Sequence, residues 1–274
     1  MKTAFSLVLK SNDYSGVLSY IKEAGFEGVE PTFHPDGIPS TGNFRKDAKL
    51  LKKEADRIGL EIPSMRGGPL FWQTFASESP AEREKAVALA RDAMECLHML
   101  GGNVLLIVPG RWEKGQSYLG LFENASQTAR KIAPLAEKQK VIVGLENVEN
   151  KFLVTPYEWC RFIDGIGSPF VRMYLDPGNI FFLNLGEPED WIEDIGKDRI
   201  CQVHMKDFVW DEKGMPAMRQ LLRGEVNWKG IISRLNEIRY DGWMIAELPL
   251  PETGKMEFLK QTKDAINRLL RGET

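Results

Sequence analysis

The chain has 274 residues and an ordinary globular composition, 43% hydrophobic and 27% charged. This composition excludes a disordered chain, a fibre and a disulfide-stabilised mini-protein, and the length allows one large domain or two small ones. The 36 Lys and Arg residues nearly balance the 39 Asp and Glu residues, which gives a formal net charge of −3. Because nucleic-acid-binding domains are usually basic, this balance gives no support to a nucleic-acid partner.

The sequence shows no pattern typical of membrane insertion or export. It has no run of 18 apolar residues, so we expect no transmembrane helix, and the apolar stretch near the N-terminus is too short for a signal peptide. Cys96, Cys160 and Cys201 match neither a disulfide framework nor a C-x-x-C motif. We therefore expect reduced, partly buried thiols and a cytoplasmic location.

Eight β-rich runs alternate with helix-like segments along the whole chain. The runs are 3–8, 28–32, 61–65, 103–108, 141–146, 171–175, 200–205 and 243–248. The helical segments that follow them are 16–24, 43–57, 81–100, 118–138, 155–166, 188–195, 228–238 and 257–271. Typical end signals flank the third helical segment, with Pro80 at its start and Gly101 beyond its end.

Strand–helix alternation of this kind predicts a parallel sheet with helices outside it. Eight repeats without a composition break favour closure into a (β/α)8 TIM barrel, as a single domain over residues 1–274. The alternative is an open, doubly wound sheet. The sequence has no G-x-G-x-x-G motif after the first run and no phosphate-binding loop motif, so the barrel is the preferred prediction.

The fifth to eighth predicted strands each end in a side chain that can bind a metal ion. These side chains are Glu146, Asp176, His204 and Glu247. Each of them alone could be a cap, a turn residue or a hydrogen-bonded core residue. Because active sites of parallel barrels lie at the carboxyl ends of the strands, we expect the four to meet. Three carboxylates and one imidazole suit Mn²⁺, Mg²⁺ or Co²⁺ better than a tetrahedral Zn²⁺ site.

Several segments resemble the xylose-isomerase-like TIM barrels, a superfamily of sugar and sugar-phosphate isomerases and epimerases. The matching segments are Gly-Leu-Glu-Asn at 144–147, Tyr-Leu-Asp-Pro-Gly-Asn at 174–179, Val-His-Met-Lys-Asp at 203–207, Gly-Glu-Val-Asn-Trp at 224–228 and Asp-Gly-Trp-Met-Ile-Ala-Glu at 241–247. Residues 25–30 and 62–65 also fit the second and third strands of the superfamily. Within it, the chain is most similar to L-ribulose-5-phosphate 3-epimerase-like proteins and, more distantly, to the D-tagatose and D-psicose 3-epimerases.

The resemblance implies that Glu146, Asp176, His204 and Glu247 hold one divalent ion, with Mn²⁺ favoured. It also implies that Glu146 and Glu247 are an acid–base pair acting on a ketose or a ketose phosphate. One of them would remove the proton from C3 to give a metal-stabilised enediolate, and the other would return a proton to the opposite face. Return of the proton to the neighbouring carbon would give an aldose–ketose isomerase with the same residues.

Three positions depart from the tagatose-type pattern and leave the substrate open. Asn179, Phe152 and Trp210 stand where many of those enzymes have His, Glu and Arg. The candidate substrate-binding residues of this chain are Glu30, Arg66, Trp112, Asn179, Lys206, Arg219 and Arg223, with Arg111 as a further cation. Candidate apolar walls are Phe71, Trp72, Trp112 and Phe181, and Lys206 with Asp207 could form a pair that orients the imidazole.

Other functions of the same architecture stay open, namely a hydroxypyruvate isomerase, an inosose dehydratase or a dehydroshikimate dehydratase. A catalytically inactive barrel that binds a sugar is a further alternative. An endonuclease IV-like nuclease is disfavoured, because its three-metal centre is rich in histidine and only His204 of the three histidines ends a predicted strand. The expected partner is therefore a small sugar or sugar phosphate rather than nucleic acid or a membrane, and a homo-oligomer is possible.

Overall fold

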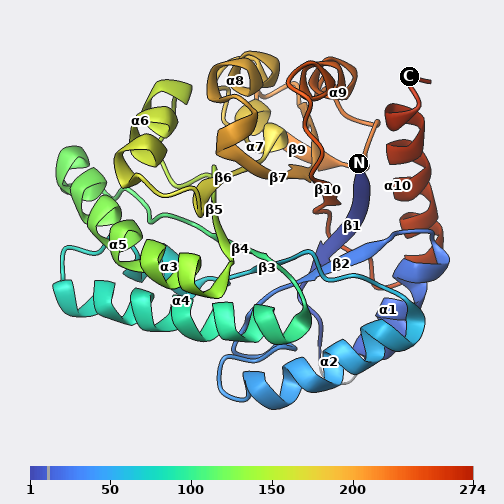
Figure 1. Ribbon diagram of the computed structural model, residues 1–274. Coiled ribbons are helices and arrows are strands. Elements are labelled where there is room, and N and C mark those ends of the chain that lie inside the picture. The colour runs from blue at the N-terminus through green and yellow to red at the C-terminus, as the bar shows by residue number, and fades with distance from the viewer. Residues whose placement is uncertain (11–12, 274) are drawn as a thin grey trace.

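The computed structural model describes residues 1–10 and 13–273, and it confirms the predicted (β/α)8 barrel (Figure 1). The parallel barrel strands are β1 (Lys2–Leu7), β2 (Gly28–Pro31), β3 (Ser64–Arg66), β4 (Val104–Ile107), β5 (Ile142–Glu146), β6 (Val171–Leu175), β7 (Ile200–Met205) and β10 (Trp243–Ala246). They hydrogen-bond in the order β2-β1-β10-β7-β6-β5-β4-β3. Single bridges from Gly28 to Glu61 and from Thr32 to Arg66 bring β2 next to β3 and complete the ring.

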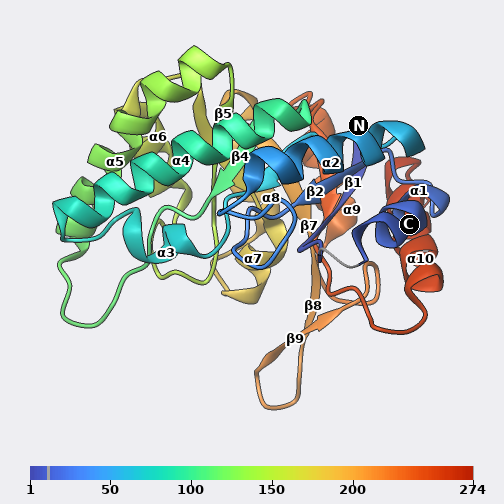
Figure 2. The same cartoon turned by 90° about the horizontal axis from the view of Figure 1, so that it is seen from below.

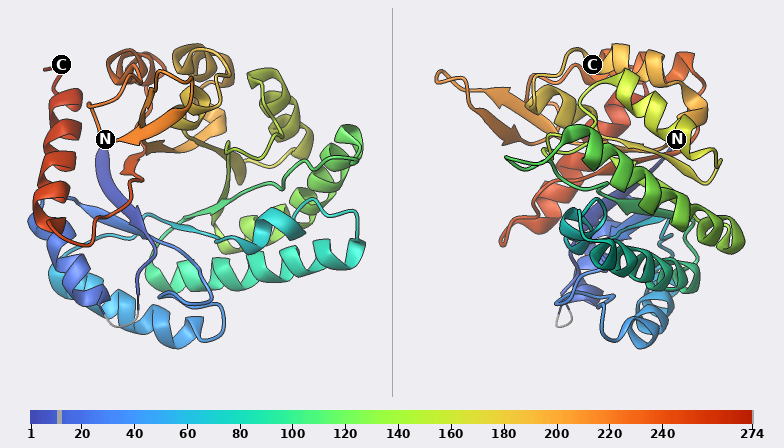
Figure 3. Two further views of the ribbon diagram at one scale, coloured as in Figure 1. Left: turned by 180° about the vertical axis from the view of Figure 1, so that it is seen from behind. Right: turned by 90° about the vertical axis from the view of Figure 1, so that its left-hand side faces the viewer.

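Helices surround the strands, as the alternating sequence pattern predicts (Figures 1 and 3). The helices are α1 (Tyr14–Glu23), α2 (Phe44–Ile58), α3 (Leu70–Thr74), α4 (Pro80–Leu100), α5 (Tyr118–Gln139), α6 (Pro156–Ile166), α7 (Pro177–Phe182), α8 (Pro188–Ile195), α9 (Trp228–Glu237) and α10 (Lys255–Leu270), with a 3₁₀ turn at Lys197–Arg199. The short helices α3 and α7 were not predicted. In the described part of the chain, no helix is both long enough and apolar enough to cross a bilayer.

Two further differences from the sequence-based prediction concern strands. The predicted third strand at 61–65 is shifted, because Pro63 has no N–H to donate to a ladder and regular pairing begins only at Ser64. Between β7 and α9 the chain also forms an unpredicted antiparallel hairpin of β8 (Asp207–Trp210) and β9 (Pro216–Arg219). The hairpin projects away from the barrel (Figures 2 and 3).

The interior of the barrel has an apolar layer with a polar layer next to it. The apolar layer consists of Ala4, Val104, Leu106, Tyr174 and Ile245, all buried. Because side chains alternate between the two faces of a strand, inward positions recur every second residue. On β5 and β7 the recurring inward positions nearer the carboxyl end are Glu146 and His204, and on β2 this position is Glu30; all three are buried. The barrel thus carries its polar residues at the end where active sites of this fold lie.

The three cysteines lie in different elements of the fold. Cys96 in α4 is buried, and Cys160 in α6 and Cys201 in β7 are partly buried. Burial raises the pKa of the Cys96 thiol. A thiol with a raised pKa is a poor nucleophile, so Cys96 has the character of a structural residue.

Candidate metal centre

Glu146, Asp176, His204 and Glu247 come together at the carboxyl ends of β5, β6, β7 and β10. One ligand-type atom of each residue lies within 4.8 Å of the corresponding atom of every other. His204 Nδ1 is 2.9 Å from Glu146 Oε1 and 3.0 Å from Glu247 Oε2, and it is 3.9 Å from Asp176 Oδ2. Glu247 is partly exposed, whereas the other three residues are buried. The residues that the sequence places at four strand ends therefore form one cluster.

The local structure after β6 turns one oxygen of Asp176 toward the cluster, where a cation can bind it. Asp176 is the N-cap of α7, and its Oδ1 accepts the backbone N–H of Asn179 at 2.9 Å. The side chain of Asn147 accepts the N–H of Asp176 and donates to its carbonyl oxygen, each at 2.8 Å. These bonds fix the position of Asp176. The second carboxylate oxygen, Oδ2, is buried and accepts no hydrogen bond from any described residue.

The cluster fits a divalent cation. Within the described ranges, the buried atoms Asp176 Oδ2 and Glu247 Oε2 both have no hydrogen-bond donor. Lys206 Nζ lies 2.8 Å from each of them as an ion pair, without the direction of a hydrogen bond. Buried carboxylates are costly unless positive charge compensates them, and a divalent ion coordinated by three carboxylates and an imidazole would add to the compensation that Lys206 provides. The donor set suits Mn²⁺, Mg²⁺ or Co²⁺.

The charged groups of the cluster shift one another's pKa values. Burial raises the pKa of the Glu146 carboxyl. Burial acts in the same direction on Glu247, but Lys206 and His204 outweigh it and hold the pKa of that carboxyl well below its usual range. Burial acts to lower the pKa of the His204 imidazole, and the surrounding carboxylates, Glu247 first, reverse this and raise it well above its usual value. The carboxylates thus draw positive charge into the site.

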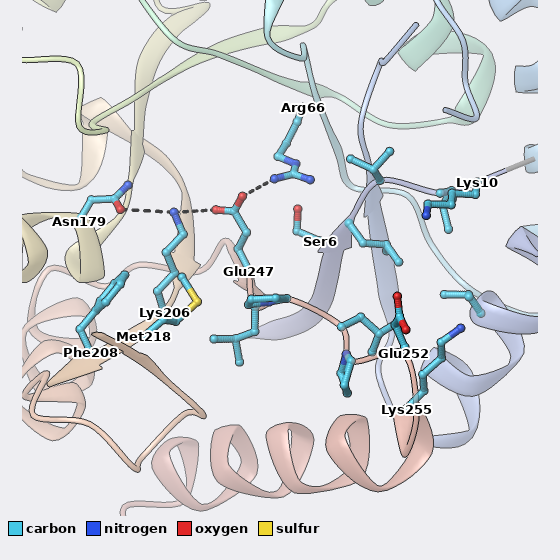
Figure 4. Close-up of a pocket in the computed structure, with 18 of the residues that line it drawn as sticks. Ser6, Lys10, Arg66, Asn179, Lys206, Phe208, Met218, Glu247, Glu252 and Lys255 are labelled. Carbon is cyan, nitrogen blue, oxygen red and sulfur yellow. Dashed lines mark hydrogen bonds and ion pairs between the residues drawn. The ribbon is translucent and has the colours of Figure 1, made fainter. Parts of the chain in front are cut away.

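Glu247 connects the cluster to a cavity of about 700 Å³ (Figure 4). Its Oε1 accepts a hydrogen bond from the Arg66 guanidinium, and its Oε2 faces Lys206 Nζ. Lys206 Nζ also donates to Asn179 Oδ1 at 3.4 Å. Arg66, Asn179, Lys206 and Glu247 all line the cavity, whose volume falls in the range typical of small-molecule sites. Three of the predicted substrate-binding residues are therefore at the cavity.

The rest of the cavity wall combines apolar residues with the charged side chains of Lys10, Asp13, Glu149, Glu252 and Lys255. Two of its residues, Phe208 on β8 and Met218 on β9, are directly paired in the hairpin. The Phe208 ring packs on Phe182 of α7 with the ring centroids 5.1 Å apart. Further apolar lining residues are Leu7, Val8, Leu9, Leu248, Pro249, Leu250 and Pro251. The base of the hairpin is thus part of the site, although its tip projects into solvent.

Glu30, a predicted substrate-binding residue, lies behind the cluster rather than in the cavity. It is fully buried, and its Oε1 is 2.8 Å from His204 Nε2. Burial acts to raise the pKa of Glu30, but His204 outweighs this effect and the net shift is downward. Glu30 therefore contacts a residue of the cluster, and its position does not support direct contact with a substrate.

Three other predicted substrate-binding residues do not line the cavity. Trp112 packs on the barrel core and donates its Nε1–H to the carbonyl oxygen of Gln116 at 3.0 Å. Arg219 on β9 is exposed and does not line the cavity, whereas its neighbour Met218 does; successive side chains of a strand face opposite sides. Arg223 is exposed in the loop that follows the hairpin.

The predicted Lys206–Asp207 pair and the predicted apolar wall of the site are not found in the structure. Asp207 does not pair with Lys206; instead its carboxylate accepts backbone N–H groups of Phe208, Gly224 and Val226, which anchors the base of the hairpin. None of the four predicted wall residues lines the cavity. Phe71 is fully buried, Trp112 packs on the core, and Phe181 packs against Trp210. Trp72 lines a different surface pocket, where the predicted cation Arg111 stacks on its ring.

Sequence reasoning also missed several residues around the cluster. These are Ser6, Ser64, Asn147, Tyr174, Phe208 and Met218. Asn147 and Tyr174 lie inside the segments that carry the family resemblance, which was an available signal. Ser64 lies in the matching segment 62–65, whereas Ser6 on β1 and the hairpin residues Phe208 and Met218 carry no such signal, so only the three-dimensional arrangement identifies those three.

Three proteins of similar sequence have informative names. A D-psicose 3-epimerase of Enterocloster bolteae is 27% identical over 245 residues, which cover 86% of this chain and 76% of the relative. A putative L-ribulose-5-phosphate 3-epimerase of Haemophilus influenzae is 24% identical and covers 84% of this chain and 82% of its own. An inosose dehydratase of Clostridium botulinum is 25% identical and covers 87% of this chain and 83% of its own.

Solved structures agree with the fold. A D-psicose 3-epimerase crystallised in the presence of D-fructose superposes with a TM-score of 0.79 at 17% identity, covering 99% of this chain and 100% of that chain. An L-ribulose 3-epimerase also gives a TM-score of 0.79 at 17% identity, covering 99% and 95%. The sequence pattern of the family described as xylose isomerase-like TIM barrel matches residues 18–271. The resemblance noted in the sequence is thereby confirmed, and the chain belongs to the xylose isomerase-like TIM barrel family.

Proposed function

We propose that this protein is a divalent-metal-dependent 3-epimerase of a ketose or a ketose phosphate. The observation that carries the proposal is the meeting of Glu146, Asp176 and His204 with Glu247, which lines a cavity in the volume range typical of small-molecule sites. The names of two relatives support it, since one is a ketose 3-epimerase and the other a putative ketose-phosphate 3-epimerase.

In this proposal, Glu146, Asp176, His204 and Glu247 hold the ion, which when bound polarises the substrate carbonyl as a Lewis acid. Glu146 and Glu247 transfer the protons. One carboxylate takes the proton from C3, so that the C–H electron pair enters an enediolate, and the other carboxyl group gives a proton to the opposite face of C3. The centre is inverted with no net change in protons or electrons. General acid–base catalysis of this kind contributes about 10²–10⁴-fold to the rate.

Arg66 and Lys206 contribute positive charge beside Glu247 in this mechanism. Both line the cavity and both contact the Glu247 carboxylate, one at each oxygen. Their N–H groups would bind substrate oxygens and stabilise negative charge that develops on the enediolate. Phe208 and Met218 would exclude water from one side of the bound sugar.

The test combines metal analysis with proton exchange. The purified protein is analysed for metal and is then incubated in D₂O with a panel of ketoses and ketose phosphates while deuterium uptake at C3 is followed by NMR. We expect exchange together with formation of the C3 epimer, and we expect Glu146→Gln to lose both metal and exchange. Arg223→Gln is the matched surface control. Exchange with none of the substrates would overturn the proposal, and unchanged metal content in Glu146→Gln would overturn the ligand assignment.

A dehydratase is the second candidate function. It is favoured by the similarity to an inosose dehydratase over most of both chains, and it needs the same acid–base pair beside a carbonyl. The two functions differ in their product. A dehydratase releases water after the first proton transfer, so mass spectrometry of the product distinguishes it from an epimerase, whose product has the mass of its substrate. A metal-free protein that binds a sugar without exchange would instead be an inactive barrel.

A further inference from the structure

A fully buried carboxylate lies behind the metal cluster, and every one of its hydrogen-bond partners comes from inside the barrel. Glu30 is 0% exposed. Its Oε1 accepts from Ser6 Oγ at 2.7 Å and faces His204 Nε2 at 2.8 Å. Its Oε2 accepts from Ser64 Oγ at 2.5 Å and from the Tyr174 hydroxyl at 2.6 Å. The mechanism proposed above uses none of Glu30, Ser6, Ser64 and Tyr174.

These contacts determine which nitrogen of His204 carries a proton. A carboxylate only accepts hydrogen bonds, so the Nε2 atom that faces Glu30 must be the donor. In a neutral imidazole the other nitrogen, Nδ1, then has a free lone pair. That nitrogen points at Glu146 Oε1 and Glu247 Oε2, which also offer only lone pairs. Without an ion, a proton on Nδ1 satisfies this arrangement, since the surrounding carboxylates raise the pKa of the imidazole. A divalent ion held by the same carboxylates would take the place of that proton, while Nε2 keeps its hydrogen toward Glu30.

The partners of Glu30 lie on strands rather than on loops. Ser6, Glu30 and Ser64 belong to β1, β2 and β3, and Ser6 is the direct register partner of Glu30. Tyr174 of β6 reaches Glu30 from the far side of the barrel, and its ring lies against the His204 ring with the centroids 4.5 Å apart. Side chains held by packed strands keep their geometry better than side chains on loops. The network therefore restrains both Glu30 and the imidazole plane.

We propose that Glu30 is a positioning residue that holds His204 in the tautomer with hydrogen on Nε2, so that Nδ1 faces the metal. Ser6, Ser64 and Tyr174 position Glu30 in turn. Such carboxylate–histidine–metal arrangements typically contribute about 10–100-fold to metal affinity. This inference rests on the metal-binding part of the proposed function and is independent of which sugar is the substrate.

The first test is the Kd of Mn²⁺ measured by isothermal titration calorimetry. Glu30→Gln keeps the size of the side chain but weakens the acceptor, and we expect the Kd to rise about 10–100-fold. Tyr174→Phe removes one of the four hydrogen-bond donors to Glu30, and we expect the Kd to rise by less than about 10-fold. Glu27→Gln is the matched control: Glu27 is near the start of the same strand, with Thr3 and Lys263 as its partners, and its substitution should leave the Kd unchanged. A wild-type Kd in Glu30→Gln would overturn the inference.

The second test observes the imidazole itself and needs no substrate. The chain has three histidines, so comparison with His34→Gln and His98→Gln assigns the ¹⁵N and ¹H signals of His204 in the Zn²⁺-loaded protein. We expect a downfield Nε2–H signal that exchanges slowly with water, and we expect it to move upfield and exchange faster in Glu30→Gln. An Nε2–H signal that is the same in both proteins would overturn the inference.

The outcomes separate this inference from the proposed function. If Glu30→Gln does not fold, as judged by circular dichroism, Tyr174→Phe and Ser64→Ala supply the graded series, and unchanged Mn²⁺ affinity in both would contradict the positioning role. A wild-type protein that binds metal with the expected His204 signal but exchanges no ketose would contradict the epimerase alone. A wild-type protein that binds none of Mn²⁺, Mg²⁺, Co²⁺ and Zn²⁺ would contradict both.

Discussion

The two halves of the barrel contribute to the site in different ways. The strands β5, β6, β7 and β10, which are adjacent in the ring, supply all four residues of the metal cluster. The strands β1, β2 and β3 of the other half supply Ser6, Glu30, Ser64 and Arg66, which contact the cluster or its supporting residues without belonging to it. One half therefore carries the candidate ligands together with Asn147 and Lys206 beside them, and the other half contributes Glu30 and Arg66, which contact His204 and Glu247 from across the ring.

The difference follows from the closed shape of the barrel. Inward side chains of one half reach those of the opposite half across a narrow interior, as the bond between Tyr174 and Glu30 and the ion pair of Arg66 with Glu247 illustrate. A ligand that is supported from across the ring does not depend on the loop that follows its own strand. Substitutions of the ligands should therefore weaken metal binding most, whereas in the other half Glu30 should affect metal affinity through His204 and Arg66 should affect turnover alone.

The largest expected effect is that of Asp176→Asn in the ligand half. Asparagine can still cap α7, so the protein should fold, while one anionic ligand is lost. Loss of a unit charge near a cation is on the order of 4 kcal/mol at an effective dielectric of 20, or about 10³-fold in affinity. Calorimetric metal titration measures this, and C3 exchange should fall in parallel. Retained metal affinity would remove Asp176 from the ligand half.

A smaller effect is expected from Arg66→Met in the supporting half. A hydrogen bond to a charged group contributes about 1.5–3 kcal/mol, so kcat/KM should fall about 10–100-fold. The metal content should stay at the wild-type level, because Arg66 contacts Glu247 and is not a ligand. Arg219→Met, on the exposed strand of the hairpin, is the control with unchanged kinetics. Metal loss in Arg66→Met equal to that in Asp176→Asn would abolish the distinction between the halves.

The hairpin lies outside both halves, and Met218→Ala tests whether its base belongs to the site. We expect KM to rise about 10-fold with little change in kcat, because part of the apolar cavity wall is removed and an apolar contact contributes about 1–3 kcal/mol. Met215→Ala is the matched control, since Met215 is 62% exposed and is not among the lining residues of the cavity. Equal kinetics of the two variants would exclude the hairpin from substrate binding.

The smallest effect is expected for Glu27→Gln, which should alter stability and leave the site intact. Burial acts to raise the pKa of Glu27, but hydrogen bonds from Thr3 and Lys263 outweigh it and lower the pKa. A carboxyl group whose pKa is lower in the folded than in the unfolded chain stabilises the fold at pH values above the unfolded-state pKa. This contribution is lost as the pH falls through the folded-state pKa. For a half-exposed pair the effect is at most about 1 kcal/mol, or about 3 °C in Tm.

Thermal unfolding of the wild type and of Glu27→Gln measures this contribution. The measurements cover roughly pH 3–7, a range that extends to both sides of the usual carboxyl pKa. The difference in Tm should be present near neutral pH and disappear in acid. A difference that persists at the acid end would assign the effect to packing rather than to the charge of Glu27. Metal affinity and C3 exchange of the variant should equal those of the wild type.

The sequence predicted the architecture and the cluster because both depend on regular repetition. Alternation of β-rich and helical segments fixes a parallel barrel, and in a parallel barrel all strands end at one face. Glu146, Asp176, His204 and Glu247 end four successive barrel strands, so their meeting follows from connectivity alone. The boundaries were less accurate where a single residue interrupts the ladder, as Pro63 does in the third strand.

The tertiary structure alone decided which other residues belong to the site. Sequence reasoning chose Glu30, Trp112, Arg219 and Arg223 for their side-chain chemistry, whereas the fold places Glu30 behind His204 and the other three outside the cavity. It equally decided that Phe208 and Met218 line the cavity, through a hairpin that no repeat predicted. The physical reason is that such contacts join strands and loops across the ring, and their geometry depends on the closed barrel rather than on the spacing of residues along the chain.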